Sequence, residues 1–153
     1  MDICQSLNHP LMFTFSALIK LEFTMAATLT KILYVEDDVD IQSVAKIALE
    51  IVGGFTLRSC SSGKEAVEHK SVEFAPDLML LDVMMPEMDG PTTLGKLREY
   101  PELSKTPVIF MTAKVQASEV AYYKSLGAIG VIAKPFDPMT LATQIRQLWS
   151  EIQ

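Results

Sequence analysis

Four short apolar runs in this chain each stop at a polar or charged side chain, and helix-length segments separate them. The runs occupy residues 31–35, 78–81, 108–111 and 130–133, and the side chains that follow them are Glu36 with Asp37, Asp82, Thr112 and Lys134. Such runs are typical of buried strands in a parallel sheet. Ligand chemistry in these sheets collects outside the carboxyl ends of the strands. We therefore expect the acids, the hydroxyl and the ammonium group to meet at one edge of the sheet.

One more strand and five helices complete the expected α/β fold. We predict strands at about 31–35, 55–60, 77–82, 107–111 and 130–133. We predict helices through 41–52, after Gly63 to about 67, at 92–100, at 118–126 and from about Pro138 onward. The first helix has an apolar stripe of Ile41, Val44, Ala45, Ala48 and Val52, and the last has Leu141, Ile145, Leu148 and Ile152. Strands that alternate with helices indicate a parallel sheet covered on both faces.

The bulk composition indicates one domain and argues against some partners. A length of 153 residues favours a single core. The net charge of −6 argues against direct binding of nucleic acid, because surfaces that bind DNA are strongly positive. Cys4 and Cys60 form no disulfide framework, which favours a reducing cytoplasm. The chain stops just after the last predicted helix, so we expect no output domain.

Residues 1–24 differ in character from the domain that we expect at 25–153. The apolar segment 11–23 carries Lys20 and Glu22, so it is too short and too interrupted to span a membrane. It also lacks the basic start of a signal peptide. Two interpretations remain open. The segment is a disordered leader added by an upstream start codon, or it is an amphipathic docking segment.

The acidic residues suit a divalent cation. Glu36 and Asp37 follow the first strand, and Asp82 follows four apolar neighbours at the end of another. Hard carboxylate oxygens suit Mg²⁺, and a carboxylate beside Mg²⁺ can attack phosphorus to form an aspartyl phosphate. The alternative is structural, since acids stabilise a helix N-terminus and Asp82 can be a turn residue. Asp38 and Asp40 fit helix capping better than metal binding.

Thr112 and Lys134 extend this set toward a phosphoryl group. A hydroxyl can donate to a phosphoryl oxygen, and an ammonium group can neutralise the charge that spreads during phosphoryl transfer. Either residue alone is weak evidence, because a threonine at a strand end and a long surface lysine are common. Their matching positions at the ends of two strands make the combination specific.

Four motifs carry a family resemblance, namely VEDD at 35–38, LLDVMMPEMDG at 80–90, MTAK at 111–114 and AKPF at 133–136. From about residue 31 to residue 153 the chain resembles the receiver domains of two-component response regulators. The resemblance implies a flavodoxin-like fold, doubly wound, with five parallel strands in the order 2-1-3-4-5. It implies a regulator rather than an enzyme, which takes a phosphoryl group from a phosphohistidine onto Asp82.

The resemblance also assigns roles around Asp82. It implies that Asp37, Asp82 and the Met84 carbonyl hold Mg²⁺, with Glu36 acting largely through water. It implies that Thr112 and Lys134 contact the phosphoryl group and that a cis peptide precedes Pro135. One departure is that Val131 stands where many receivers have an aromatic residue that reports phosphorylation.

Three other interpretations compete with this one. A haloacid-dehalogenase-like phosphatase needs a second acid two residues after the nucleophile, where this chain has Met84. A flavodoxin-like carrier of flavin mononucleotide needs a phosphate-binding loop where this chain has three acids. The third is a receiver-shaped interaction module that is never phosphorylated.

We therefore expect a stand-alone, cytoplasmic response regulator. Its expected partners are a histidine kinase or histidine phosphotransfer protein, and a downstream protein. The downstream protein should bind the face made by the helix at 118–126, the fifth strand and the last helix. We expect no direct contact with nucleic acid or a membrane.

Overall fold

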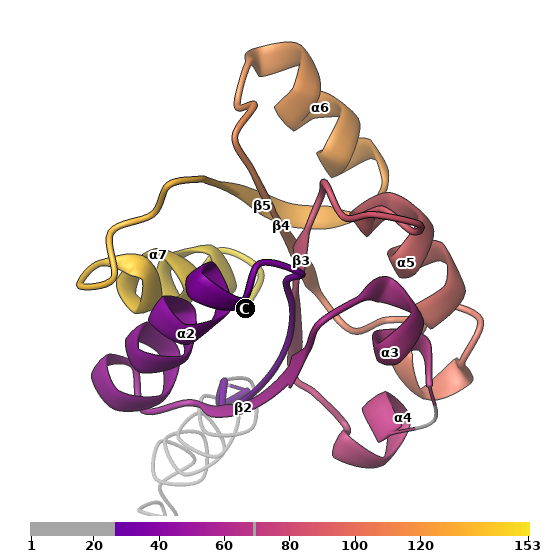
Figure 1. Ribbon diagram of the computed structural model, residues 1–153, viewed down its shortest axis with the longest axis horizontal. Coiled ribbons are helices and arrows are strands. Elements are labelled where there is room, and N and C mark those ends of the chain that lie inside the picture. Colours follow the sequence, from indigo (N-terminus) through magenta and orange to yellow (C-terminus); the bar gives the residue numbers. More distant parts are fainter. Residues whose placement is uncertain (1–26, 69) are drawn as a thin grey trace, which may run out of the picture.

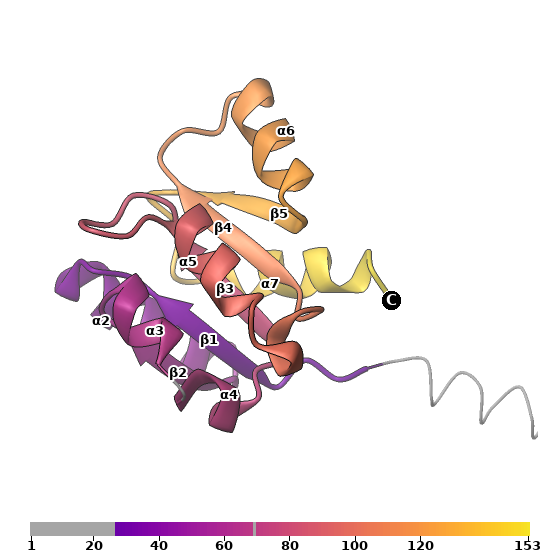
Figure 2. The same cartoon turned by 90° about the vertical axis from the view of Figure 1, so that its right-hand side faces the viewer.

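The computed structural model of the protein describes residues 27–68 and 70–153, so expectations for residues 1–24 fall outside the described part. It has one five-stranded sheet in which all neighbouring strands are parallel (Figures 1 and 2). The strands are β1 (Lys31–Val35), β2 (Thr56–Cys60), β3 (Leu78–Asp82), β4 (Val108–Thr112) and β5 (Ala128–Ala133). Their order, β2-β1-β3-β4-β5, confirms the predicted flavodoxin-like topology.

The central strands are buried because both faces of the sheet are covered. All five residues of β3 and of β4 are buried, as their unbroken apolar sequences predict. The helix α2 (Val39–Lys46), its continuation η2 (Ile47–Val52) and α7 (Leu141–Ser150) cover one face (Figure 1). The short helix α3 (Gly63–Val67), α5 (Gly90–Leu97) and α6 (Ala117–Ser125) cover the other. Two separate apolar cores result, one on each side of the sheet.

The first helix departs from its predicted register. From Ile47 it continues as a π-helix, whose i→i+5 hydrogen bonds give more residues per turn than an α-helix. The wider turn rotates later side chains away from the 3.6-residue stripe. Leu49 is therefore buried, whereas Val52, which we placed on the apolar face, is exposed. Val44, which we also placed on that face, is exposed although it precedes the π-helix.

Three further details differ from the prediction. A short helix, α4 (Lys70–Phe74), lies between α3 and β3, and a 3₁₀ turn, η3 (Pro101–Leu103), follows α5. The last helix begins at Leu141 rather than at Pro138. Asp137 holds residues 138–140 in a turn before this helix. Its side chain accepts a hydrogen bond from the Met139 N–H, and its carbonyl accepts one from the Leu141 N–H.

Candidate functional site

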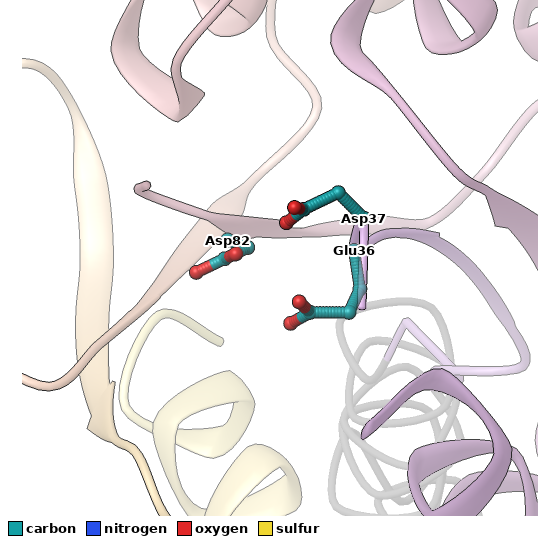
Figure 3. Close-up of side chains that lie close together, drawn as sticks. All are labelled: Glu36, Asp37 and Asp82. Carbon is teal, nitrogen blue, oxygen red and sulfur yellow. The ribbon is translucent and has the colours of Figure 1, made fainter. Parts of the chain in front are cut away.

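The acidic residues predicted to meet at the carboxyl edge of the sheet do so. Glu36 and Asp37 follow β1, Asp82 ends β3, and the three side chains lie close together (Figure 3). One carboxylate oxygen from each lies within 4.8 Å of the other two. Glu36 and Asp82 are buried, with relative exposures of 1% and 3%, and Asp37 is half-buried. Three acids at this separation repel one another unless a cation joins them.

Lys134, which follows β5, supplies a positive charge to this cluster. Its Nζ lies 2.8 Å from Glu36 Oε2 and 3.2 Å from Asp82 Oδ1. The other oxygen of Glu36 accepts a hydrogen bond of 3.2 Å from the Asp38 N–H. The lysine therefore bridges two of the acids, and Asp37 has no ion pair with it among the described residues.

The balance of charges shifts the pKa of two groups. Burial, and next the neighbouring Glu36, raise the pKa of Asp82 to about 6 despite the opposing effect of Lys134. Burial alone would lower the pKa of Lys134, but Glu36 and Asp82 outweigh it and raise that pKa. One ammonium group is thus too little charge for the three acids, and the site has capacity for another cation.

Thr112 joins the site from the end of β4. It is buried, and its Oγ1 accepts a hydrogen bond of 3.1 Å from the Lys114 N–H. The Thr112 carbonyl accepts a hydrogen bond of 2.9 Å from the Lys134 N–H. This bond extends the pairing of β4 with β5 and places Lys134 beside Thr112. The peptide bond between Lys134 and Pro135 is cis. Val131 is half-buried and lies opposite Phe110 in the strand register.

The acids just beyond this cluster cap the first helix, as we expected of Asp38. The Asp38 side chain accepts from the N–H groups of Asp40 and Ile41, so it is the N-cap of α2. Asp40 lies in the first turn, where a negative charge complements the helix dipole.

One polar group near the site, the Tyr34 hydroxyl, was not predicted from the sequence. Tyr34 on β1 is buried, and its hydroxyl has no hydrogen-bond partner within the described chain. Burial first, and then the charges of Glu36 and Asp82, raise its pKa far above the usual value. The apolar context of β1 predicted only that this residue belongs to the core.

Gly90 fixes the loop after β3 close to Asp82. A Cβ at this position would lie 2.4 Å from the Asp82 carbonyl oxygen. We predict that Gly90→Ala lowers the free energy of unfolding by about 2 kcal/mol, because backbone must move to admit the methyl group. The control is Gly95→Ala in the same helix, where a Cβ would meet nothing within 4 Å. That change should raise stability by about 0.5–1 kcal/mol, and urea unfolding of both variants checks the pair.

The donor set fits a divalent cation. Hard oxygens from Glu36, Asp37 and Asp82 converge, and Mg²⁺ is commonly held by one or two carboxylates with several waters. Met84 follows in the next loop with its side chain exposed, and its thioether is a poor ligand for Mg²⁺.

Residues 32–146 match the family model described as the response regulator receiver domain. The chain belongs to the response-regulator receiver family. The response regulator SaeR of Staphylococcus aureus (strain USA300) is 32% identical over 125 residues, which make up 82% of this chain and 53% of SaeR. The receiver thus spans about half the length of that curated relative.

Solved structures of receivers share the fold. The chemotaxis protein CheY4 of Vibrio cholerae superposes with a TM-score of 0.71 at 26% identity, over 79% of this chain and 99% of CheY4. The receiver domain of a histidine kinase from Syntrophus aciditrophicus is 34% identical with a TM-score of 0.66, over 81% and 92% of the two chains. Of the helices that the structure describes, none is both long enough and apolar enough to cross a bilayer.

Proposed function

We propose that this receiver accepts a phosphoryl group from a phosphohistidine onto Asp82, with Mg²⁺ bound in the acidic cluster. The observation that carries the proposal is the grouping of Glu36, Asp37 and Asp82 around one point, with Lys134 Nζ 3.2 Å from Asp82. A purely structural ion pair would need one acid for one lysine. Here three acids face a single ammonium group, as suits a site that adds a metal ion and a phosphoryl group.

In the proposed reaction an Asp82 carboxylate oxygen attacks the phosphorus of the phosphohistidine. The new O–P bond forms as the P–N bond breaks, and the imidazole nitrogen leaves with the electron pair and takes up a proton. Lys134 then turns part of its hydrogen bonding from Glu36 and Asp82 to the phosphoryl oxygens. The Thr112 hydroxyl donates a hydrogen bond to another of those oxygens.

Asp37, Asp82 and the Met84 carbonyl would hold the metal, with Glu36 acting through water. When bound, Mg²⁺ neutralises charge on the carboxylates and on the transferred group. The acids would hold the ion at this edge of the sheet, and Lys134 keeps Glu36 in place through its 2.8 Å ion pair.

The phosphorylated receiver then acts on another protein in the cytoplasm. We place the donor as a histidine kinase or histidine phosphotransfer protein. The downstream partner binds α6, β5 and α7, because the loop that follows Thr112 leads directly into α6. The receiver acts through that contact or by passing the phosphoryl group onward, without binding nucleic acid itself.

Intact-protein mass spectrometry tests the assignment of Asp82. Incubation with a small phosphodonor and Mg²⁺ should add the mass of one phosphoryl group to the wild type. Asp82→Asn should add none, and a metal chelator should stop the reaction in the wild type. Incorporation that persists in Asp82→Asn would refute the proposed acceptor. A folded wild type that stays unmodified by both a small donor and a panel of phosphorylated kinases would favour the unphosphorylated interaction module instead.

A further inference from the structure

An aromatic residue reaches the switch region from helix α6 rather than from β5. Val131 on β5 carries no ring, but Tyr123 of α6 packs its ring against Phe110 of β4, with 5.2 Å between the ring centroids. Tyr123 is buried, with 8% relative exposure, whereas its neighbour Tyr122 is 54% exposed. Only Tyr123 therefore faces the sheet.

The position of Phe110 brings the Tyr123 hydroxyl toward Thr112. Phe110 and Thr112 are two residues apart on β4, so their side chains lie on the same face of the sheet. The Thr112 side chain lowers the Tyr123 pKa and so partly offsets the rise that burial causes, as expected if its hydroxyl lies beside the tyrosine oxygen. Thr112 Oγ1 already accepts from the Lys114 N–H at 3.1 Å, so its own proton is free to point toward the tyrosine.

An acceptor for the Tyr123 hydroxyl lies one helical turn before Tyr123. Glu119 lies four residues before Tyr123, on the same side of α6. Burial is the largest cause of the raised Tyr123 pKa, and the negative charge of Glu119 is the second largest. Glu119 Oε2 is buried and has no hydrogen-bond partner in the described part of the chain. A buried acceptor without a donor costs free energy, so a hydroxyl that can turn toward it gains a favourable hydrogen bond.

The geometry points to Tyr123 as the residue that couples Thr112 to helix α6, by exchanging Thr112 for Glu119 as its hydrogen-bond partner. In the resting protein the Tyr123 oxygen faces the Thr112 hydroxyl. When Thr112 turns to a phosphoryl group on Asp82, the tyrosine loses that donor, and its hydroxyl turns to donate a hydrogen bond to Glu119 Oε2. This inference rests on the proposed phosphorylation of Asp82, and it names the route by which that event reaches the partner face.

The exchange requires the hydroxyl and not the ring. Tyr123→Phe keeps the packing on Phe110 but removes both hydrogen-bonding options. Thr112 can still reach the phosphoryl group in this variant. Asp82 and Thr112 should therefore respond to phosphorylation as in the wild type, while helix α6 should no longer respond. Tyr122→Phe makes the same chemical change at the adjacent exposed position and is the matched control.

Backbone amide NMR with beryllofluoride and Mg²⁺ as the phosphoryl mimic separates these effects. In the wild type we expect shift changes at Asp82 and Thr112 and along residues 117–126. In Tyr123→Phe the changes at Asp82 and Thr112 should persist, and those along 117–126 should fall to less than half. Tyr122→Phe should behave as the wild type. Thermal melting of the unliganded variants verifies that both are folded.

Three results would count against the inference in different ways. Undiminished changes along 117–126 in Tyr123→Phe overturn the role of Tyr123 alone. A wild type whose Asp82 amide does not respond to beryllofluoride overturns the proposed function and, with it, this route. Equal losses in the Tyr122→Phe and Tyr123→Phe variants also overturn it, because they assign the effect to α6 in general.

Discussion

Replacing Lys134 by Met should lower the free energy of unfolding by about 3 kcal/mol near neutral pH without Mg²⁺, because it leaves buried acids without their cation. Met keeps most of the aliphatic stem, so the change removes mainly the charge. Glu36 and Asp82 would lose ion pairs of 2.8 and 3.2 Å, and both are nearly inaccessible to water. Urea unfolding at matched ionic strength measures the loss.

Lys114 provides the matched control for Lys134. It lies in the loop beside Thr112 but is exposed, so Lys114→Met should change stability by less than about 0.5 kcal/mol. Mg²⁺ should restore part of the stability lost in Lys134→Met, because it replaces the missing positive charge. Acidification should also restore part of it, since protonation removes one unpaired charge. Similar losses at both lysines would contradict the account of the buried cluster.

Asp82→Asn should have the opposite effect and raise the free energy of unfolding by about 1–2 kcal/mol at about pH 7.5 without Mg²⁺. The ionised Asp82 is held close to Glu36 in a buried position, which raises its pKa to about 6 from a usual 3.8. Asparagine keeps the shape and removes the charge. Part of the gain is offset because Lys134 loses one of its two partners.

The pH dependence of this effect follows from the raised pKa. Between about pH 4 and 6 the folded protein binds more protons at Asp82 than the unfolded chain does, so stability falls as pH rises through that window. The advantage of Asp82→Asn should therefore be small near pH 4 and complete above pH 6. Urea unfolding at several pH values checks this trend. An Asn variant that is less stable than the wild type at about pH 7.5 would contradict it.

The strands could be predicted because their burial leaves continuous apolar runs in the sequence, and their order followed from the resemblance to receiver domains. Residues 78–81 and 108–111 are continuous apolar runs, which are typical of strands covered on both faces. The topology then brought Glu36, Asp82 and Lys134 to one edge, as expected from the ends of their strands. Local pattern and global fold agree in this part of the chain.

Other features depend on packing that no local pattern records. The π-helix at Ile47–Val52 changes the helical period, so a stripe drawn at 3.6 residues misplaced Val52. The short helix α4 has too few residues for a periodic signal. The buried hydroxyl of Tyr34 and the approach of Tyr123 to Thr112 arise from contacts between distant elements. Motif spacing identifies the ends of strands, but it does not show which side chains reach them from helices.

Chemical identification of the phosphorylated residue is the most direct test of the central claim. Borohydride reduces an aspartyl phosphate to homoserine, which peptide mass spectrometry can locate. The account predicts homoserine at position 82 and at no other aspartate after treatment with a phosphodonor and Mg²⁺. Homoserine at Asp37 or Asp38, or a phosphate on a hydroxyl or imidazole side chain with residue 82 unmodified, would contradict it.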